Sequence, residues 1–400
     1  MMSIDDQLRI LSRRCERVLS EPDLRAKLKK SAATGKPLRI KLGMDPTAPD
    51  VTLGHAVPLQ VVRQFQDWGH KAVLIIGDYT ARVGDPTGRN KTRPQLTGEE
   101  IDANAETYVA QVGRILLTRP ECLEVRYNGE WLGKMGLVDI IRLASRATVA
   151  QMLAREDFAN RLASGTEIRL HEILYPLLQG WDSVMIEADV EMGGSDQLFN
   201  NLVGREFQKE AGQEGQVVIV TPLLVGTDGV KKMSKSQHNY IALTDPAAGE
   251  NGVFGKIMSL PDALMESYYT LLTDVSPDEY RPLIESSPRD AKMCLARHII
   301  GWLHSAEAAD GAQKAFVQQF VEKQAPEQMP EFTVAVGDHK LIDLLVTAQL
   351  AASKGEARRK IAEGGVDVDG QRAADAQASV PVNGEVVLRL GRKYARVKTG

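Results

Sequence analysis

Cysteine and long apolar runs are scarce in this sequence, and each shortage excludes a class of protein. Three cysteines occur, far apart and without a CxxC pair, so the sequence predicts neither a disulfide framework nor a zinc site. The most apolar runs, 72–76 and 217–220, are far shorter than the roughly 20 residues of a membrane-spanning helix. The chain starts with MMSIDD, which lacks the basic and then apolar pattern of a signal peptide. We therefore expect a cytoplasmic protein without membrane association.

The composition that remains is that of a globular protein with more than one domain. The chain has 400 residues, of which 43% are hydrophobic and 26% are charged, so two or three packed units are expected. The net charge is -4, yet residues 337–400 hold 11 Lys/Arg against 8 Asp/Glu. A basic end on an acidic body indicates a tail that faces nucleic acid.

The first hundred residues predict a βαβ unit. Residues 38–44 alternate as a strand does and precede a turn with two prolines. Beyond Leu53, apolar residues recur at helical spacing as far as Gly69, which places Pro58 in the first turn of a helix. The run AVLIIGD at 72–78 is almost wholly apolar, as in a strand that is buried on both faces of a parallel sheet. The fold class is therefore α/β.

The sequence beyond residue 98 predicts two more strands of this sheet, a helical domain, a linker and a small C-terminal domain. Strands around 183–192 and 216–224 continue the sheet after an insertion at 99–172. The expected organisation is a parallel-sheet domain at 1–246, an α-helical domain at 247–325, a proline-containing linker at 326–336 and a small α+β domain at 337–400. In the small domain we expect two short helices, the second capped by Ser353, and strands that are joined by glycine and asparagine turns.

Two short motifs carry residue types that suit nucleotide binding. TLGH (52–55) opens the first predicted helix, where free N–H groups, a partial positive charge and a glycine admit a phosphate or a base. There His55 can donate to phosphate oxygens; taken alone, it is equally a surface histidine in a turn. KMSKS (232–236) holds Lys232 and Lys235, whose ammonium groups can close over a triphosphate. The alternative for KMSKS is a solvated basic loop.

With these motifs the chain resembles the bacterial tyrosyl-tRNA synthetases, a family of class I aminoacyl-tRNA synthetases. TLGH stands where that class has its HIGH motif, and KMSKS is its second signature in full. The resemblance runs nearly end to end, through DPTAPD (45–50), GDPTG (84–88), YPLLQGWD (175–182) and GGSDQ (193–197). Residues 340–400 are similar to S4 RNA-binding domains, and Lys41 resembles the second bacterial subgroup.

This resemblance implies a Rossmann-like catalytic domain and the reaction of a tyrosine–tRNA ligase. L-tyrosine and ATP with Mg²⁺ would form tyrosyl-adenylate and pyrophosphate, and the tyrosyl group would then pass to the 3′ end of tRNA(Tyr). Neither a tightly bound cofactor nor a metal held by protein side chains is expected. Because the tyrosine carboxylate is already ionised at neutral pH, the reaction needs no side-chain nucleophile or general base. A homodimer joined near residues 120–165 is also implied.

The resemblance also assigns roles to matching residues. Asp85, Tyr175 and Gln179 would hold the tyrosine ammonium, and Asp182 would accept from the phenol hydroxyl. Spacing supports this set independently, because Tyr175, Gln179 and Asp182 fall at i, i+4 and i+7 and so share one helix face. The other implied residues are Gln197 and Lys41 for tyrosine, Asp45, Thr47, Gly54, His55, Asp196 and Lys235 for ATP, and Thr52, Arg89, Arg93, Lys232 and Lys235 around pyrophosphate.

Two of these positions depart from the family pattern. Thr52 replaces the first histidine of the motif, so a neutral hydroxyl stands where a cationic donor is usual. Lys41 stands where some members have a tyrosine that also contacts the phenol hydroxyl. In the C-terminal domain Arg358, Arg359 and Lys360 form the densest basic cluster. The cluster would neutralise RNA phosphates; the alternative is a solvated helix face.

Three other interpretations compete with this one. Tryptophanyl-tRNA synthetases share the fold and both signatures, but the set at 175, 179 and 182, the GGSDQ segment and the S4-like tail favour tyrosine. A non-catalytic RNA-binding relative is suggested only by Thr52, against an intact KMSKS and a complete amino-acid pocket. A dehydrogenase-type dinucleotide site is weaker still, because GxGxxG is absent after the first strand.

Overall fold

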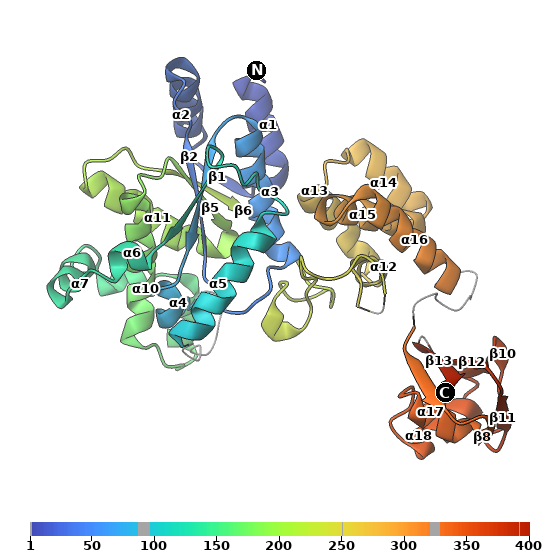
Figure 1. Cartoon of the computed structure of the whole chain (residues 1–400). Helices are drawn as coiled ribbons and strands as arrows, with labels where there is room; N and C mark the ends of the chain where they lie inside the picture. The colour runs from blue at the N-terminus through green and yellow to red at the C-terminus, as the bar shows by residue number, and fades with distance from the viewer. Residues whose placement is uncertain (1, 87–96, 250, 321–328, 392) are drawn as a thin grey trace. The chain divides into compact units, whose positions relative to one another are not determined.

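The chain folds into two compact units, Met1–Ala309 and Asp310–Gly400. The structure is a computed structural model, and it describes residues 2–86, 97–249, 251–320, 329–391 and 393–400 (Figure 1). Within these ranges no helix is both long enough and apolar enough to cross a membrane. Residues 1–246 and 247–309, which the sequence predicted to lie in separate domains, belong to the same unit.

A six-stranded sheet forms the centre of the first unit, in the order β1-β6-β5-β2-β3-β4. Strands β2 to β6 run parallel, and β1 pairs with β6 in the antiparallel sense. The order reverses at β2, which lies between β3 and β5. Ligands bind at such a reversal, outside the carboxyl ends of the strands. The strands are β1 (Arg17–Leu19), β2 (Arg39–Met44), β3 (Lys71–Ile76), β4 (Leu123–Tyr127), β5 (Val190–Gly194) and β6 (Val217–Thr221).

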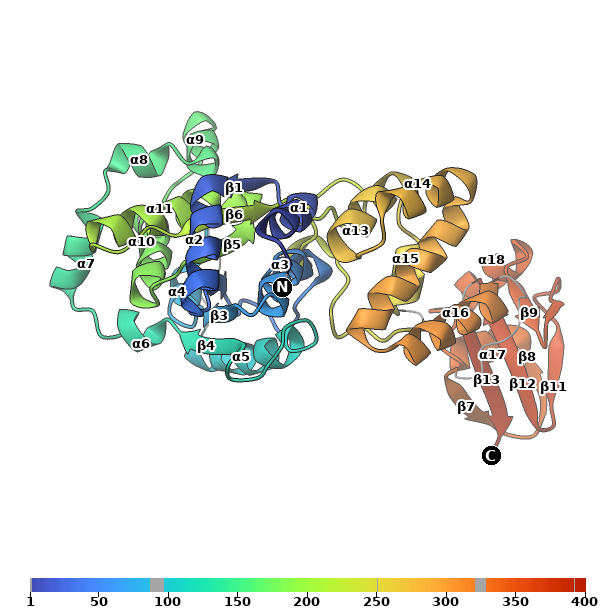
Figure 2. The same cartoon turned by 90° about the horizontal axis from the view of Figure 1, so that it is seen from above.

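Helices cover both faces of this sheet (Figure 2). Helix α3 (Leu53–Asp67) packs on one face, and α11 (Leu198–Glu210) with its neighbour α10 (Leu170–Met185) packs on the other. The predicted βαβ unit is therefore confirmed as β2, α3 and β3. The remaining helices of this region are α1 (Ile4–Arg14), α2 (Glu21–Thr34), α4 (Thr80–Val83), α5 (Gly98–Val112), α6 (Gly129–Leu132), α7 (Leu137–Ala144), α8 (Val149–Leu153) and α9 (Glu156–Ala163).

The structure corrects three local expectations. Pro58 lies inside α3 and not in its first turn, because the helix already begins at Leu53; the ring has no N–H for the carbonyl of Gly54. Residues 183–185 end helix α10, so the strand expected from 183 begins only at Val190. The insertion is not separate from the sheet, since it contributes the edge strand β4.

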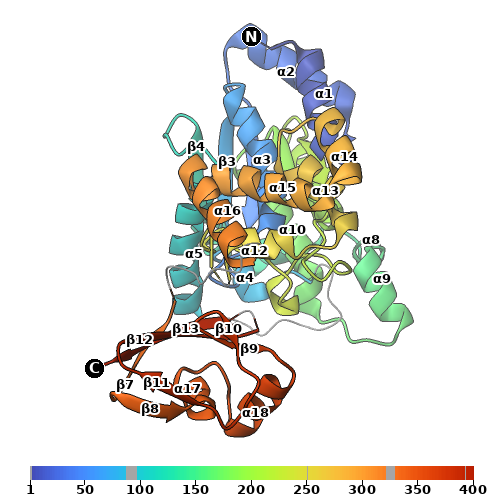
Figure 3. The same cartoon turned by 90° about the vertical axis from the view of Figure 1, so that its right-hand side faces the viewer.

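Residues 253–303 are helical, as their apolar spacing predicted. Helices α12, α13 and α14 pack against α15 in one cluster (Figure 3). Inside it, Tyr269 stacks on Tyr280 with 4.8 Å between the ring centroids. The helices are α12 (Val253–Met258), α13 (Met265–Leu272), α14 (Pro277–Ser286) and α15 (Pro288–Leu303), and α16 (Ala306–Phe320) contains the boundary between the two units.

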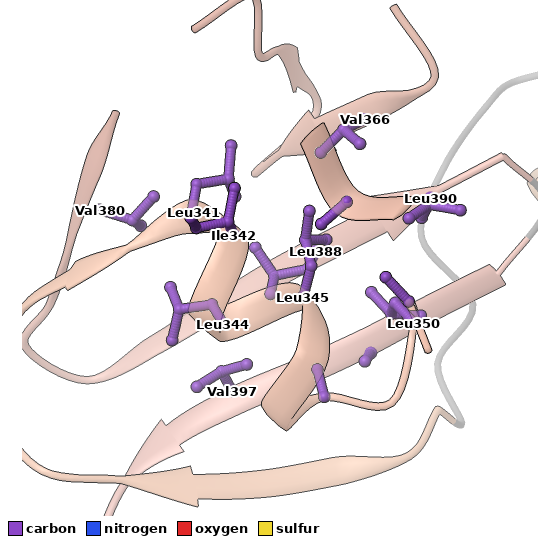
Figure 4. Packing of buried hydrophobic residues seen from close by; sticks show 14 of the residues in the cluster. Leu341, Ile342, Leu344, Leu345, Leu350, Val366, Val380, Leu388, Leu390 and Val397 are labelled. Atoms are coloured by element: carbon purple, nitrogen blue, oxygen red, sulfur yellow. The ribbon is translucent and has the colours of Figure 1, made fainter. Parts of the chain in front are cut away.

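The second unit has its own hydrophobic core, in which Leu345, Leu388 and Val397 are fully buried (Figure 4). Its strands form the sheets β10-β9-β12-β13-β7 and β11-β8. The hairpin β9-β10 turns at Asp369 and Gly370, which both have positive φ, as a tight hairpin turn requires. The elements are β7 (Glu331–Val334), β8 (Gly337–Lys340), α17 (Leu341–Thr347), α18 (Lys354–Ala362), β9 (Val366–Val368), β10 (Gln371–Arg372), β11 (Ser379–Val382), β12 (Glu385–Leu390) and β13 (Lys393–Thr399).

The expected linker at 326–336 is corrected by strand β7. Residues 331–334 pair in parallel with β13, from Arg396 opposite Glu331 to Thr399 opposite Val334. This half of the segment is therefore part of the C-terminal sheet. The predicted cap of the second helix is confirmed, because the Ser353 side chain accepts from the N–H of Glu356 at 3.2 Å.

Candidate active site

A cavity of 1140 Å³ opens at the carboxyl ends of β2 and β5, where the strand order reverses. Its volume exceeds that of a site for one small ligand, so it has room for two substrates side by side. Most of the predicted site residues line it together, although they come from segments nearly 200 residues apart. They are Asp45, Thr47, Thr52, Gly54, His55, Asp85, Tyr175, Gln179, Asp182, Asp196, Gln197, Lys232 and Lys235.

Asp182 lines this cavity and is 3% exposed. Trp131 donates its indole N–H to Oδ1 at 2.8 Å, and Asn128 donates its amide to Oδ2 at 3.2 Å. Burial raises the pKa of Asp182 to about 7, against the lowering effects of Lys41 and of these two donors. The carboxylate is thus fixed in position, with acceptor lone pairs left for a ligand hydroxyl.

A second carboxylate, Asp45, links the turn after β2 to helix α10. The Tyr175 hydroxyl donates to its Oδ2 at 2.9 Å, and the Thr80 hydroxyl donates to its Oδ1 at 2.8 Å. Gly77 makes this contact possible, because a Cβ there would lie 1.9 Å from Asp45 Oδ1. Asp45, which was predicted to bind ATP, is thereby hydrogen-bonded to Tyr175, which was predicted to bind tyrosine.

Amide side chains connect Gln179 to Asp85 across the cavity. Asn200 donates to Gln179 Oε1 at 3.0 Å and to Gln197 Oε1 at 3.1 Å. Gln197 in turn donates to Asp85 Oδ2 at 2.8 Å. Three of the residues predicted to bind tyrosine, Gln179, Gln197 and Asp85, therefore belong to one hydrogen-bonded chain.

Lys41 does not lie where its implied role in tyrosine binding requires. It is fully buried and is not part of the cavity wall. Its side chain pairs with Glu191 of β5, with 2.8 Å between Nζ and Oε1. The reason is the strand order, which places Lys41 directly opposite Glu191 on neighbouring parallel strands.

Thr52 and His55 cap the first turn of α3 with each other. His55 Nδ1 lies 3.2 Å from the Thr52 backbone N and 2.8 Å from Thr52 Oγ1. Because the backbone N–H must donate, Nδ1 is the acceptor, which assigns the proton of the neutral ring to Nε2. The backbone N–H of Thr52 thus fixes the tautomer of His55, and the Thr52 hydroxyl contacts the same ring nitrogen.

The KMSKS segment lies beside this helix start, since a Cβ on Gly54 would be 3.6 Å from Met233 Cβ. Lys232 Nζ donates to Asp196 Oδ2 at 2.9 Å. Lys235 Nζ donates to the carbonyls of Ala48 and Asp50 at 3.2 and 2.5 Å and to the Tyr108 hydroxyl at 3.0 Å. Both ammonium groups therefore face the same cavity as His55.

The remaining predicted residues lie outside the described ranges or in the second unit, and two residues that contact Asp182 were not predicted. Arg89 and Arg93 lie outside the described residues. Arg358, Arg359 and Lys360 lie on α18 in the second unit, where Glu363 pairs with the latter two at 3.8 and 2.8 Å. Sequence reasoning missed Trp131 and Asn128; predicting β4 would have pointed to Asn128, which directly follows that strand.

Comparison with known proteins identifies the family of this chain. The family model for class I tRNA synthetases (W and Y) matches residues 33–321, and that for the SYY-like C-terminal domain of tyrosine–tRNA ligase matches 321–396. The tyrosine–tRNA ligase of Moorella thermoacetica is 50% identical over 400 residues, which cover 98% of this chain and 96% of that protein. That of Thermotoga maritima is 48% identical over 406 residues, covering 100% and 99%.

Solved structures show the same fold. A C-terminally truncated mitochondrial tyrosyl-tRNA synthetase from Aspergillus nidulans superposes with a TM-score of 0.64 at 25% identity, covering 80% of this chain and 95% of that one. For the tyrosyl-tRNA synthetase of Archaeoglobus fulgidus, solved with L-tyrosine, the TM-score is 0.61 at 23% identity, with coverage of 78% and 100%. The chain therefore belongs to the tyrosine–tRNA ligases, within the class I tRNA synthetases.

Proposed function

We propose that this protein activates L-tyrosine with ATP and then charges tRNA(Tyr). The tyrosine carboxylate attacks the α-phosphorus of ATP, an acyl–phosphate bond forms, and the bond to the β-phosphate breaks to release pyrophosphate with Mg²⁺. The terminal ribose hydroxyl of tRNA then attacks the acyl carbon and AMP leaves. Charging of tRNA serves translation, so a cytoplasmic location is part of this proposal.

The position of Asp182 is the observation that supports tyrosine as the amino-acid substrate. Its carboxylate lines the cavity, held by two neutral donors, on the same helix face as Tyr175 and Gln179. A phenol hydroxyl that donates to it would be satisfied, whereas phenylalanine would leave the buried carboxylate without that partner. Tyr175, Gln179 and the Gln197–Asp85 pair then receive the ammonium.

The phosphate chain of ATP belongs at the start of α3, between His55 and the KMSKS lysines. The helix N-terminus, the Nε2–H of His55 and two ammonium groups all carry positive charge towards this part of the cavity. These groups stabilise the charge that develops on the leaving pyrophosphate. Asp196 would hold the ribose once Lys232 has moved from it to the phosphates.

Exchange of labelled pyrophosphate into ATP tests this function directly. Purified protein is supplied with ATP, Mg²⁺ and either tyrosine, tryptophan or phenylalanine. We expect exchange with tyrosine, because only this side chain of the three carries a hydroxyl donor at the far end of a six-membered ring, where Asp182 can accept from it. Exchange with tryptophan alone, or with none of the three, would contradict the proposal.

The basic cluster on α18 is proposed to bind tRNA phosphates. Arg358 and Arg359 are exposed, and Lys360 is half-buried. Replacing all three by alanine is expected to raise the KM for tRNA about tenfold at moderate salt, with a weaker salt dependence, because fewer counterions are released on binding. Tyrosine-dependent pyrophosphate exchange serves as the control and should not change. Loss of both activities would mean that the cluster supports the fold instead.

A homodimer is proposed through the segment near 120–165. Helices α7 to α9 expose Leu137, Val138, Ile141, Val149 and Leu162 by 54 to 76% of their surface. Burial of these large apolar side chains against a second copy would remove them from water. Light scattering of the wild type should give twice 43.9 kDa, and Leu137→Asp with Ile141→Asp should give the monomer. Val336→Asp, at a residue 67% exposed in the other unit, should remain dimeric.

A further inference from the structure

Lys41 carries a buried positive charge beside the amino-acid site. Its Nζ lies 2.8 Å from Glu191 Oε1, 2.7 Å from Ser183 Oγ and 3.0 Å from the carbonyl oxygen of Gln179. An ammonium group has three N–H donors, and these three acceptors use all of them. Lys41 therefore has no donor left for a substrate, and it lies behind the cavity wall.

Stability alone does not account for this ion pair. Lys41 is 0% exposed and Glu191 1%, and burying two charges costs about as much desolvation energy as their attraction returns. The pair instead contacts the helix that carries the amino-acid site. Lys41 bonds the Gln179 carbonyl and Ser183, and Glu191 accepts from Ser183 at 3.0 Å. Both contacts lie within four residues of Asp182 on α10.

Two hydrogen-bond donors and two charged side chains act on the Asp182 carboxylate. From α6 and the residue before it come the neutral donors Trp131 and Asn128. The charged groups that act on Asp182 are Lys41 of β2 and Glu191 of β5. Burial raises the pKa of Asp182 to about 7; among the groups that oppose this, Lys41 has the largest effect, whereas Glu191 adds to the rise.

We propose that Lys41 is a positioning residue that selects tyrosine without touching it. Its ammonium keeps Asp182 in the carboxylate form that accepts from the phenol hydroxyl, and its bond to the Gln179 carbonyl holds this part of α10 in register with β2. This inference rests on the proposed tyrosine activation. It also explains how a lysine can stand where other members of the family use a tyrosine that touches the substrate.

The test replaces each partner of the ion pair in turn. The two replacements should shift the midpoint of the pH profile in opposite directions. Tyrosine kcat/KM in pyrophosphate exchange is measured from pH 6 to 9 for the wild type, Lys41→Met and Glu191→Gln. The wild-type midpoint should lie near the Asp182 pKa of about 7. Lys41→Met should move it up by about one unit, which is about a fivefold loss at pH 7 that recovers at pH 9, and Glu191→Gln should move it down. The rate of pyrophosphate exchange with phenylalanine should not change with pH in the way that the rate with tyrosine does.

Two further variants separate this role from a structural one. Lys41→Met leaves Glu191 buried and unpaired, so the charge-neutral double variant Lys41→Met/Glu191→Gln is included to restore folding; it should keep a raised midpoint. Arg161→Met breaks another buried ion pair, Arg161–Glu172 at 2.8 Å, and should destabilise the protein without moving the midpoint.

Three outcomes would overturn the inference: shifts of Lys41→Met and Glu191→Gln in the same direction, no shift in either, or an equal shift in Arg161→Met. Thermal unfolding of every variant shows which ones are folded and can be compared. If Lys41→Met alone fails to fold, the double variant and Glu191→Gln decide the result. A wild type without tyrosine-dependent exchange would contradict the proposed function itself, which distinguishes the two failures.

Discussion

Replacing Asp182 by alanine should lower tyrosine kcat/KM in pyrophosphate exchange about a thousandfold while the KM for ATP stays within about twofold. The substitution removes the acceptor for the phenol hydroxyl and leaves the Trp131 indole N–H and the Asn128 amide without their buried partner. A site that hydrogen-bonds a substrate hydroxyl rejects the analogue without it by orders of magnitude, because the polar groups of the site are then left unpaired. Tyrosyl-tRNA synthetases, which reject phenylalanine, are a known example. Preference for tyrosine over phenylalanine should therefore collapse.

A matched control lies on the same helix. Glu172 is also a buried carboxylate of α10, but it pairs with Arg161 and does not line the cavity. Glu172→Gln should cost stability and leave the ratio of tyrosine to phenylalanine unchanged. If Asp182→Ala retains the wild-type ratio, its assigned role is wrong.

The wild type should show the same dependence on pH. Because burial raises the pKa of Asp182 to about 7, the folded protein without substrate takes up a proton there as pH falls below this value. The protonated group no longer offers a charged acceptor to the phenol. Selectivity for tyrosine should thus be full above pH 8 and decline towards pH 6, with phenylalanine exchange nearly constant over this range.

The sequence predicted the elements whose signals are local. The run 72–78 is apolar on both faces because β3 has β2 and β4 as neighbours and helices above and below. Tyr175, Gln179 and Asp182 could be placed on one face because a helix repeats every 3.6 residues, whatever packs around it. Asp45, Asp196 and His55 met in one cavity because the first two follow the ends of neighbouring parallel strands and His55 starts the helix after β2.

Non-local pairing explains what the sequence could not predict. Lys41 meets Glu191 only because β2 lies next to β5, and no pattern within β2 records this neighbour. Strand β7 was taken for a linker because it is short and follows two prolines, and its partner β13 lies more than 60 residues further on. Trp131 reaches Asp182 from a four-residue helix that has no periodic signal.

Replacing Lys235 by methionine should reduce kcat for adenylate formation about a hundredfold to a thousandfold, with tyrosine KM within about twofold. In the structure Lys235 Nζ bonds two backbone carbonyls, of Ala48 and Asp50, and the Tyr108 hydroxyl. These neutral acceptors are weaker partners for an ammonium group than a triphosphate that carries several negative charges. The lysine should therefore exchange them for the phosphates as charge develops on the leaving group.

The split between kcat and KM distinguishes this role from a structural one. If Lys235 only held the turn at 48–50, its loss would disturb Asp45 and Tyr175 beyond it, and tyrosine KM would rise together with the fall in kcat. Lys209→Met removes an exposed ammonium that pairs with Glu206 on α11, outside the cavity, and should change neither constant. A rise in tyrosine KM that accompanies the fall in kcat of Lys235→Met would therefore assign the residue to the scaffold and leave charge stabilisation to Lys232 and His55.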